Sequence, residues 1–520
     1  MTTISLRDEA AGLLQELIRL DTVNPPGNET LVAEHLRRYL EGNGVSCELL
    51  ARVPERANLV ARIPGTGDGP RLLLLSHTDT VLADPGEWQI DPWSGELRDG
   101  QVWGRGALDM KGQTAASAVA IASLAREGLE PVGDLIFAAC ADEEVGAGFG
   151  LQWLVEEHPE AVRAEYCINE GGGDRLVLDG RAFWICSTAE KMSAPFELTV
   201  HGRSGHASRP GIADNALVKA APLVERLGVF HDEPELGPEV AAFLRAVCGE
   251  VPDATEAVAV ARAVHPLAGD IVEPLLGTTL SPTMIEASQK RNVIPNRCEI
   301  TVDCRILPGH TQDEVEAKVA DHLQGAEYDL EWIEAQGGTG SPVETPLWDV
   351  VGSFVAEIEP EAQSVPLLLS GFTDSHWVRD AFGTVAYGFF PMRAMEAELA
   401  ARLIHSADER IEVDDLEWIE AQGGTRSPVE TPLWDLVESF VAEIEPEAQT
   451  VPLLLSGFTD SHWVRDAFGT VAYGFFPMRA MEAELAAYLI HSADERIEVD
   501  DLELGVRFLR HAATALASLP

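Results

Sequence analysis

Apolar and polar positions follow two alternating patterns over the first 170 residues of the chain. Helical apolar spacing over residues 13–40 predicts two helices, which are separated by the turn Asn24-Pro25-Pro26-Gly27. Helical spacing returns at residues 114–126 and 151–157. Short apolar runs that end in polar or glycine-rich loops predict strands at residues 58–63, 71–76, 134–139 and 166–169. This alternation is typical of an α/β domain, in which functional side chains gather where the strands end.

A different pattern begins near Lys191. Strand and helix signals follow in the order βαββαβ, at residues 195–201, 215–227, 278–287, 297–306, 312–323 and 328–335. This order predicts a small α+β domain inserted into the first domain. We therefore expect a first domain in two parts, residues 1–190 and 338–520, and an inserted domain at residues 191–337.

Residues 330–415 recur almost unchanged as residues 416–501. The copies differ at five pairs of positions: Gly340/Arg426, Val350/Leu436, Gly352/Glu438, Ser364/Thr450 and Arg402/Tyr488. An 86-residue period is too long for a common solenoid unit, and two near-identical copies are too few for an evolved array. A recent unequal duplication or an assembly error explains the pattern better. Each functional position in the repeat therefore has two candidates for a single site.

The composition argues against several classes of partner. The net charge is −49 and the chain has only five lysines, so phosphates would be repelled, and we expect neither nucleic-acid nor membrane binding. No apolar run approaches the ~20 residues of a membrane span, and residues 1–20 lack the layout of a secretory signal. The seven cysteines are scattered and include no Cys-x-x-Cys pair, which favours buried thiols in a reducing cytoplasm.

The first candidate for chemistry is His77, which directly follows a predicted strand and stands two residues before Asp79. A histidine in this position can bind a metal through one ring nitrogen, while the carboxylate accepts the other ring N–H and fixes the tautomer. The same pattern also occurs at strand ends that have only a structural role. His77 and Asp79 therefore indicate a metal site only in combination with other ligands.

Carboxylates follow the other predicted strands. Asp109 lies in a glycine-rich segment that can fold tightly against a ligand, although helix capping is the alternative role. Glu143 and Glu144 are adjacent, so a cation or a shared proton would relieve their repulsion; a solvated acidic turn is the alternative. Glu170 follows a strand and precedes three glycines.

A second imidazole comes from the repeat, as His405 in the first copy and His491 in the second. Together these positions supply two imidazoles and several carboxylates at strand ends. Mixed nitrogen and oxygen ligands suit zinc, with cobalt or manganese as alternatives. The combined pattern indicates a site for divalent metal.

With these motifs in this order, the sequence resembles the co-catalytic zinc amidohydrolases of metallopeptidase clan MH. This is the family of acetylornithine deacetylase, succinyl-diaminopimelate desuccinylase, aminoacylases and glutamate carboxypeptidase. The resemblance covers nearly the whole chain. It implies an α/β fold: a zinc-peptidase catalytic domain with a mixed central sheet flanked by helices, and an inserted α+β lid and dimerisation domain. The C-terminal part of the catalytic domain is then the part that is tandemly duplicated.

The resemblance also implies two metal ions and a role for each ligand. His77 and Glu170 would bind one ion, and Glu144 and the C-terminal histidine would bind the other. Asp109 would bridge both ions, with the Asp109–Met110 peptide bond in the cis form.

Glu143 would then be the general base, and Asp79 would support catalysis by orienting His77. The role of Glu143 also has a physical basis. A carboxylate beside two cations can take a proton from the attacking water, whose pKa is lowered toward ~7, and deliver it to the leaving amine. Hydrolysis of an amide is the reaction that this set of residues favours.

Three residues of the inserted domain gain roles from the same resemblance. His206 would reach the cleft of the partner subunit in a homodimer and stabilise the oxyanion of the tetrahedral intermediate. Asn292 and Arg305 would contact the substrate. Without the resemblance, His206 reads as an ordinary loop histidine.

One departure from the family concerns the substrate. Relatives often carry Thr-Asp-x-Arg, whose arginine pairs with a substrate carboxylate, whereas this chain has His376, repeated as His462, at the arginine position. Recognition of a free carboxylate would then fall to Arg379 or its repeat equivalent Arg465.

We therefore predict a homodimeric cytoplasmic metallohydrolase that cleaves an N-acyl amino acid or a small peptide. The rival is a non-catalytic metal-binding relative whose site the duplication disrupts, and the intact Glu143 and ligand positions argue against it. A two-metal phosphoesterase would need more Asp and His ligands and a basic cleft, which the acidic composition does not favour.

Overall fold

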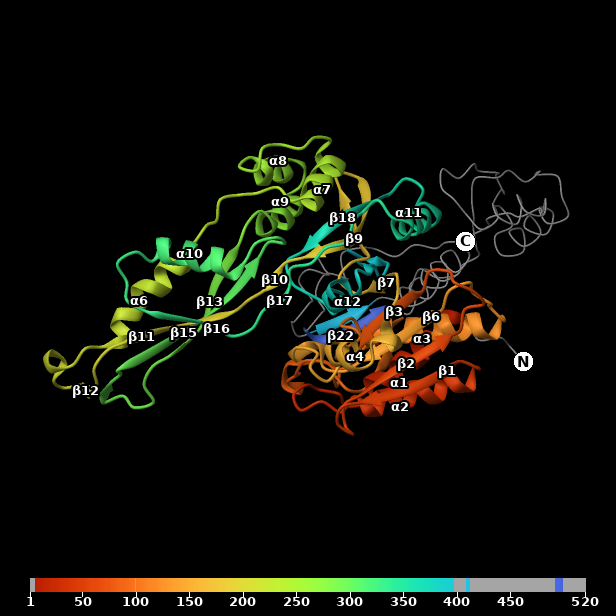
Figure 1. Cartoon of the computed structure of the whole chain (residues 1–520), viewed down its shortest axis with the longest axis horizontal. Helices are drawn as coiled ribbons and strands as arrows, with labels where there is room; N and C mark the ends of the chain where they lie inside the picture. Colours follow the sequence, from red (N-terminus) through yellow and green to blue (C-terminus); the bar gives the residue numbers. More distant parts are fainter. Residues whose placement is uncertain (1–4, 99, 397–407, 412–491, 499–520) are drawn as a thin grey trace. The chain divides into compact units, whose positions relative to one another are not determined.

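The computed structural model describes residues 5–98, 100–396, 408–411 and 492–498 (Figure 1). His405, His462, Arg465 and His491 lie outside the described residues. In the described parts, no helix is long and apolar enough to cross a membrane.

The chain forms two compact units. The first comprises Met1–Cys186, Pro342–Val365 and Ala381–Pro520, and the second comprises Ser187–Ser341 and Pro366–Asp380. The segment Pro366–Asp380 therefore groups with the second unit, whereas the sequence prediction assigned it to the catalytic domain. The reason is local, because Arg379 of this segment is buried against Glu190.

A ten-stranded mixed sheet forms the centre of the first unit. Its strand order is β1 (Ser46–Ala51), β2 (Ala57–Ile63), β6 (Leu135–Cys140), β3 (Leu72–His77), β7 (Tyr166–Asn169), β19 (Val385–Gly388), β9 (Arg181–Glu190), β8 (Asp174–Leu178) and β20 (Met392–Glu396), and β18 (Gln363–Leu369) pairs with β9. Four neighbouring strands are parallel to one another: β6, β3, β7 and β19. The strand β2 is antiparallel to both of its neighbours, β6 and β1. The four strands predicted from apolar runs correspond to β2, β3, β6 and β7, and the mixed α/β sheet is confirmed.

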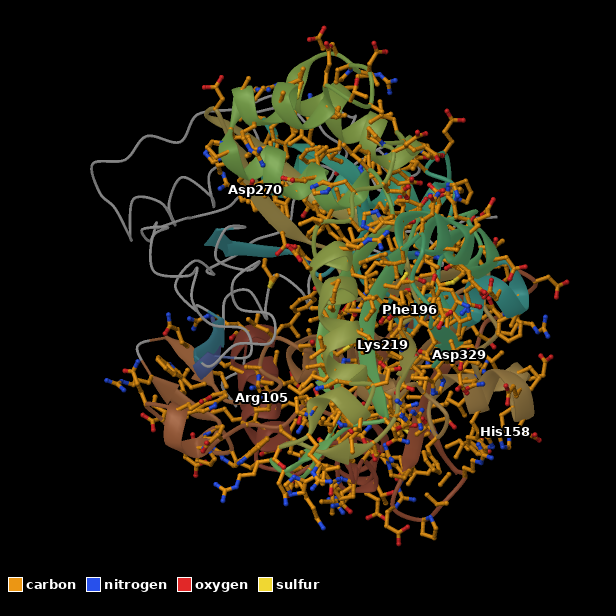
Figure 2. All side chains as sticks on the ribbon, turned by 90° about the vertical axis from the view of Figure 1, so that its left-hand side faces the viewer. Arg105, His158, Phe196, Lys219, Asp270 and Asp329 are labelled. Carbon is orange, nitrogen blue, oxygen red and sulfur yellow. The ribbon has the colours of Figure 1, made fainter. Side chains whose placement is uncertain are left out.

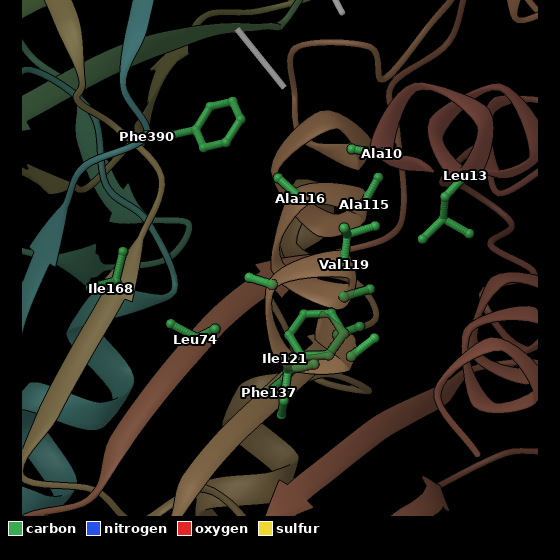
Figure 3. Close-up of a cluster of buried hydrophobic side chains, with 14 of the residues drawn as sticks. Ala10, Leu13, Leu74, Ala115, Ala116, Val119, Ile121, Phe137, Ile168 and Phe390 are labelled. Atoms are coloured by element: carbon green, nitrogen blue, oxygen red, sulfur yellow. The ribbon is translucent and has the colours of Figure 1, made fainter. Parts of the chain in front are cut away.

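The core of this unit lies between the sheet and its helices. These are α1 (Leu6–Ile18), α2 (Thr30–Gly42), α3 (Lys111–Arg126), α4 (Leu151–Glu157), α5 (Pro159–Val162) and α11 (Pro346–Ile358). Figure 3 shows α3 between α1, which carries Ala10 and Leu13, and the strands that carry Leu74 and Phe137. Residues 111–124 of α3 are all buried, because small side chains let neighbouring elements approach this helix from every side.

Three parallel strands bring the predicted site residues to one edge of the sheet. β3 ends at His77, β7 ends one residue before Glu170, and β6 is followed by a short 3₁₀ turn, η2 (Glu143–Val145). Since neighbouring parallel strands present their carboxyl ends at the same edge, these side chains converge.

A smaller sheet of the first unit contains segments from both repeat copies. Its strands are β4 (Glu96–Arg98), β5 (Gln101–Trp103), β21 (Asp408–Ile411) and β22 (Ser492–Glu498). β4 pairs with β5, both β21 and β22 also pair with β5, and β21 and β22 pair with each other in parallel. Trp103 is in register with Arg410 of the first copy and with Arg496 of the second, which are equivalent positions in the repeat. Both copies therefore fit the same part of β5.

The second unit contains a six-stranded sheet with the order β16 (Asp329–Trp332), β11 (Phe196–His201), β15 (Arg297–Ile306), β10 (Met192–Ser193) and β17 (Gln336–Gly337), and β13 (Thr279–Glu286) pairs with β15. Burial alternates strictly along β15, whose inward side chains pack with α6 (Ala216–Leu227) and α10 (Gln312–His322). This order of strands and helices matches the predicted βαββαβ pattern.

Three helices of the second unit, between α6 and β13, were not predicted: α7 (Pro238–Cys248), α8 (Ala257–Val264) and α9 (Pro266–Val272). The helix α12 (Ser375–Phe382), most of which belongs to this unit, was not predicted either. Elsewhere on this unit, Asp270 and Asp329 (labelled in Figure 2) contact Arg262 and His201 at 2.8 Å but keep 65% and 79% of their side-chain surface exposed. Such carboxylates contribute to the acidic surface that the composition predicted.

Candidate metal centre

His77 is the centre of a compact group of acidic side chains in the first unit. Its Nε2 lies 3.0 Å from Asp109 Oδ1 and 3.7 Å from Glu170 Oε1. Two overlapping sets, His77 with Asp109 and Glu144 and His77 with Glu143 and Glu170, each bring one ligand atom per residue within 4.8 Å of one another. The structure therefore unites all five predicted residues, which come from three strand ends and the start of α3.

The electrostatics of this group favour a cation. Burial raises the pKa of Glu144, and repulsion from Asp109, Asp79 and Glu170 adds to that effect. Burial also raises the pKa of Glu170, to about 7. Carboxylates that resist ionisation beside one another are stabilised as anions when positive charge lies between them.

His77 shows the opposite balance. Burial by itself would lower the pKa of the imidazole, but the carboxylates of Glu170, Asp109 and Asp79 outweigh it and raise the pKa well above its usual value. The site therefore attracts positive charge to its centre.

Glu144 offers a more direct test of whether the residues fit a metal ion. Among the described residues, no hydrogen-bond donor reaches the buried Oε1 atom of Glu144. A buried carboxylate oxygen without a donor is costly unless a cation binds it. An imidazole with three or four carboxylates is a ligand set that suits divalent metal, so the residues fit the predicted group.

Asp79 holds both the ligand histidine and the acidic turn. Its Oδ1 lies 3.4 Å from Nδ1 of His77 and accepts the backbone N–H of Glu143 at 3.1 Å. Its Oδ2 accepts the backbone N–H of Glu144, also at 3.1 Å. Burial would raise the pKa of Asp79, but these bonds, the one from His77 first, lower it, so the group stays ionised. Asp79 therefore contacts both His77 and the turn that carries Glu143 and Glu144.

Glycines allow close packing around Asp109. Gly104 has a φ of +151°, and a Cβ there would lie 2.9 Å from the carbonyl oxygen of Pro92. Gly106 has a φ of +84°. The Asp109–Met110 peptide bond is cis, as the family resemblance implied.

Two predicted residues of the second unit lie side by side. His206 is on β12 (Gly205–His206), which pairs with β14 (Val293–Ile294), and the carbonyl of Asn292 accepts the backbone N–H of Ala207 at 3.0 Å. His206 is exposed, and its Nδ1 lies 2.8 Å from the hydroxyl of Ser208.

The arginines proposed for substrate binding already have carboxylate neighbours. Arg305 donates to Asp303 at 2.9 Å, and Arg379 lies 3.2 Å from Glu190 in a buried ion pair. Nδ1 of His376 lies 2.7 Å from the carbonyl of Thr373. Burial lowers the pKa of His376 to about 4, so this imidazole is neutral at physiological pH and cannot supply the positive charge of the arginine it replaces.

Sequence reasoning missed a buried group next to the site, formed by Asn24, Glu29, Arg56 and Asp142. The turn at Asn24 was predicted only as a break between two helices. Asn24 and Asp142 are 118 positions apart, so their contact leaves no local signal in the sequence.

Comparison with known proteins agrees with this geometry. The family described as Peptidase family M20/M25/M40 matches residues 73–419. The succinyl-diaminopimelate desuccinylase of Rhodospirillum centenum is 28% identical over 421 residues, which is 78% of this chain and 92% of the relative.

Two solved structures are similar over almost the whole chain. The M20 family metallo-carboxypeptidase of Sulfolobus solfataricus has a TM-score of 0.61 at 16% identity and covers 98% of this chain and 100% of its own. Human carnosine dipeptidase 1 has a TM-score of 0.61 at 13% identity and covers 99% of this chain and 97% of its own. The family resemblance noted in the sequence is confirmed: the chain belongs to peptidase family M20/M25/M40 and is a metal-dependent hydrolase of amide or peptide bonds.

Proposed function

We propose that this enzyme hydrolyses the amide bond of a small N-acyl amino acid or peptide, with Glu143 as the general base. The observation that carries the proposal is the placement of Glu143 on the turn that also carries the ligand Glu144, with both backbone N–H groups held by Asp79. A base fixed next to the ligands can reach a water molecule at the site.

In the proposed reaction, the metal ions and the side chains have separate roles. When bound, two divalent ions polarise the scissile carbonyl and acidify the attacking water. His77, Asp109, Glu144 and Glu170 would hold them, with a histidine of the repeat, His405 or His491. Glu143 accepts one proton of the water while the water oxygen bonds to the carbonyl carbon. The same proton then goes to the leaving nitrogen as the C–N bond breaks, so that an acid and an amine are released.

Zinc is the metal that we propose for this site. Imidazole nitrogen with carboxylate oxygen is a common zinc ligand set, and cobalt or manganese can occupy similar sites. Equilibrium dialysis followed by elemental analysis would identify the ions retained by the purified protein.

The second unit is proposed as a lid and dimerisation domain. Several of its apolar side chains are exposed: Leu217 and Val218 on α6, at 42% and 66%, and Met284 and Ile285 on β13, at 57% and 49%. Exposed apolar side chains near an edge strand are suited to contact with a second copy. In such a homodimer His206 would donate from Nε2 to the oxyanion in the partner's site.

The substrate class is proposed from the relatives and from the second unit. One relative is a desuccinylase and one similar structure is a dipeptidase, which fits an acyl or peptide amide. We propose that Asn292 and Arg305 contact the substrate. A role for Arg379 in binding a substrate carboxylate would require this arginine to turn from Glu190 toward the substrate. Arg465, its equivalent in the repeat, is the alternative candidate. The scattered cysteines support a cytoplasmic location.

The alternative, a metal-binding relative without activity, is not favoured, because the chain retains Glu143 and the four proposed ligands of the first unit. The test is an assay of N-acetyl, N-succinyl and dipeptide substrates with zinc and with cobalt. We expect metal-dependent release of amine from at least one class. A protein that retains two metal ions but cleaves none of them would contradict the proposal.

A further inference from the structure

Arg56 is a buried cation that lies between two carboxylates of the first unit. Its Nε donates to Glu29 at 2.6 Å, and its Nη2 donates to Glu29 at 2.7 Å and to Asp142 at 2.7 Å. All three residues are nearly inaccessible, with exposed fractions of 7% for Arg56, 0% for Glu29 and 6% for Asp142. A buried ion pair of this kind stays stable only while each partner remains paired.

The turn at residues 24–27 is shaped around this arginine. The carbonyl of Pro26 accepts from Arg56 Nη1 at 3.2 Å. Gly27 has a φ of +78°, and a Cβ there would lie 2.7 Å from Arg56 Nη2. The turn therefore supplies an acceptor and leaves space for the guanidinium group.

Asn24 links this ion pair to the metal centre. Its Nδ2 donates to Asp142 Oδ1 at 3.0 Å and to Asp79 Oδ2 at 2.8 Å. An amide nitrogen has two hydrogens, so one Asn24 side chain satisfies both carboxylates. An aspartate at this position would have the same shape but would provide no donor and a third negative charge.

Asp79 and Asp142, which accept the two hydrogen bonds from Asn24, both hold the Glu143–Glu144 turn in position. Asp142 directly precedes the turn, and its Oδ2 also accepts the backbone N–H of Phe149 at 3.1 Å. Asp79 accepts the backbone N–H groups of Glu143 and Glu144. The turn is therefore fixed from two sides, and Asn24 is the residue that the two sides share.

We propose that Asn24 and Arg56 are positioning residues for the metal centre, acting through Asp142 and Asp79 on the Glu143–Glu144 turn. The inference rests on the proposed function for the identity of the site, but it concerns the affinity of the site for metal. Groups that orient metal ligands typically change metal affinity by about 10- to 100-fold when they are lost.

The experiment measures the dissociation constant for Co²⁺, and the visible absorption of the Co²⁺ complex, in the full-length protein. The variants are Asn24→Asp, Asn24→Ala and Arg56→Lys. Arg62→Lys is the matched control, because Arg62 also pairs with an aspartate of the first unit, Asp134. Its other hydrogen bonds within the described residues go to the carbonyls of Glu160 and Ala161, outside the candidate site. Thermal midpoints of the metal-free proteins show which variants are folded at the assay temperature.

We expect Co²⁺ binding to weaken about 10- to 100-fold in Asn24→Asp, with a changed absorption spectrum. Smaller losses are expected in Asn24→Ala and in Arg56→Lys, because a lysine can pair with only one of Glu29 and Asp142. The Arg62→Lys control should stay within threefold of the parent. If Asn24→Asp fails to fold, Asn24→Ala and Arg56→Lys decide the result.

A purely structural role predicts a different outcome. The metal-free variants would then melt at lower temperature, but the folded proteins would bind Co²⁺ within threefold of the parent and with an unchanged spectrum, and this result would overturn the inference. The two proposals can fail separately. If the proposed function is wrong and the positioning role is right, the parent protein hydrolyses no amide, but the variants still bind Co²⁺ more weakly than the parent. An active parent with unchanged affinity in all three variants contradicts the positioning role alone.

Discussion

Asp79 Oδ1 accepts the backbone N–H of Glu143 at 3.1 Å. The carboxylate next to the ligand histidine thus also holds the main chain of the proposed base. Substitution of Asp79 would disturb both residues at once, so the two roles have to be tested at Glu143 itself.

Glu143→Ala should retain metal and lose hydrolysis. Removing a general base typically lowers turnover about 10²- to 10⁴-fold, whereas the proposed ligand set remains complete. Metal analysis and the turnover number together check this, and Glu144→Ala is the matched control because it should lose metal. Activity of Glu143→Ala within threefold of the parent would refute its role as base. Loss of metal would instead make Glu143 a ligand, which its place in the His77 and Glu170 group also permits.

His206→Ala should lower turnover without changing metal content or dimer size. An oxyanion donor acts mainly in the transition state, and its loss costs roughly 3 to 4 kcal/mol. If His206 acts in the partner's site, mixing His206→Ala with Glu143→Ala subunits should restore part of the activity through hybrid dimers. Absence of recovery after verified subunit exchange would argue against a role across the interface.

Removal of metal should reverse the pH dependence of stability. In the metal-free protein the pKa of Glu170 is about 7, above its usual value of 4.5, so the fold holds a proton that the unfolded chain releases. The resulting stabilisation is fully present below pH 4.5 and is lost as the pH rises through 7. The raised pKa of His77 acts in the same direction.

We therefore expect the thermal midpoint of the metal-free protein to fall as the pH rises from 6 to 8. The fall should correspond to a loss of about 1 kcal/mol in the free energy of unfolding. Solvent limits its size, because the Glu170 side chain keeps 18% of its surface exposed. The metal-loaded protein, whose carboxylates must be ionised, should not show this fall. Glu170→Gln should remove most of the difference. A metal-free midpoint that rises with pH over this range would contradict the account.

The repeat should make its histidines redundant. Only one set of Asp109, Glu144 and Glu170 exists, so it can accept one C-terminal histidine. His405→Ala and His491→Ala should each retain some metal and activity, and only the double variant should lose both. If either single substitution empties one metal position completely, the chain uses one fixed copy.

The pairing of β5 provides a second test of the repeat. Val102 is in register with Ile411 and with Ile497, so a chain with cysteine at all three positions can form either disulfide, but not both. Tryptic cleavage after Arg410 and Arg496 gives different peptides, residues 411–426 and 497–507, which mass spectrometry separates. We expect both to be recovered linked to residue 102. Recovery of one alone would show a single register. A link between residues 411 and 497 would show the pairing of β21 with β22.

A candidate site could be predicted from the sequence because several of its residues follow buried parallel strands. Such strands read as continuous apolar runs, so the positions of His77 and Glu170 could be predicted from their strand ends. The helices α7 to α9 were missed although Val240, Phe243, Leu244 and Val247 have helical spacing, because glycines and prolines interrupt the region. The contacts of Asn24 and Arg56 could not be predicted, since long-range pairing of polar residues leaves no periodic pattern.

Because β4 occupies one edge of β5, the two repeat strands β21 and β22 share the other edge, and the order of their synthesis matters. Ile411 is made 86 residues before Ile497, which at about 5 to 20 residues per second gives the first copy a lead of roughly 4 to 17 seconds. Local strand pairing takes about 1 to 10 microseconds, so the first copy has time to reach β5 while this edge is still empty. Where the first copy has paired with β5 during synthesis, a molecule with Val102 paired to Ile497 must have exchanged one strand for its duplicate after translation. The ratio of the two pairings thus reports strand exchange in the finished protein, and a pulse-chase of newly made chains would show it changing with the age of the molecule.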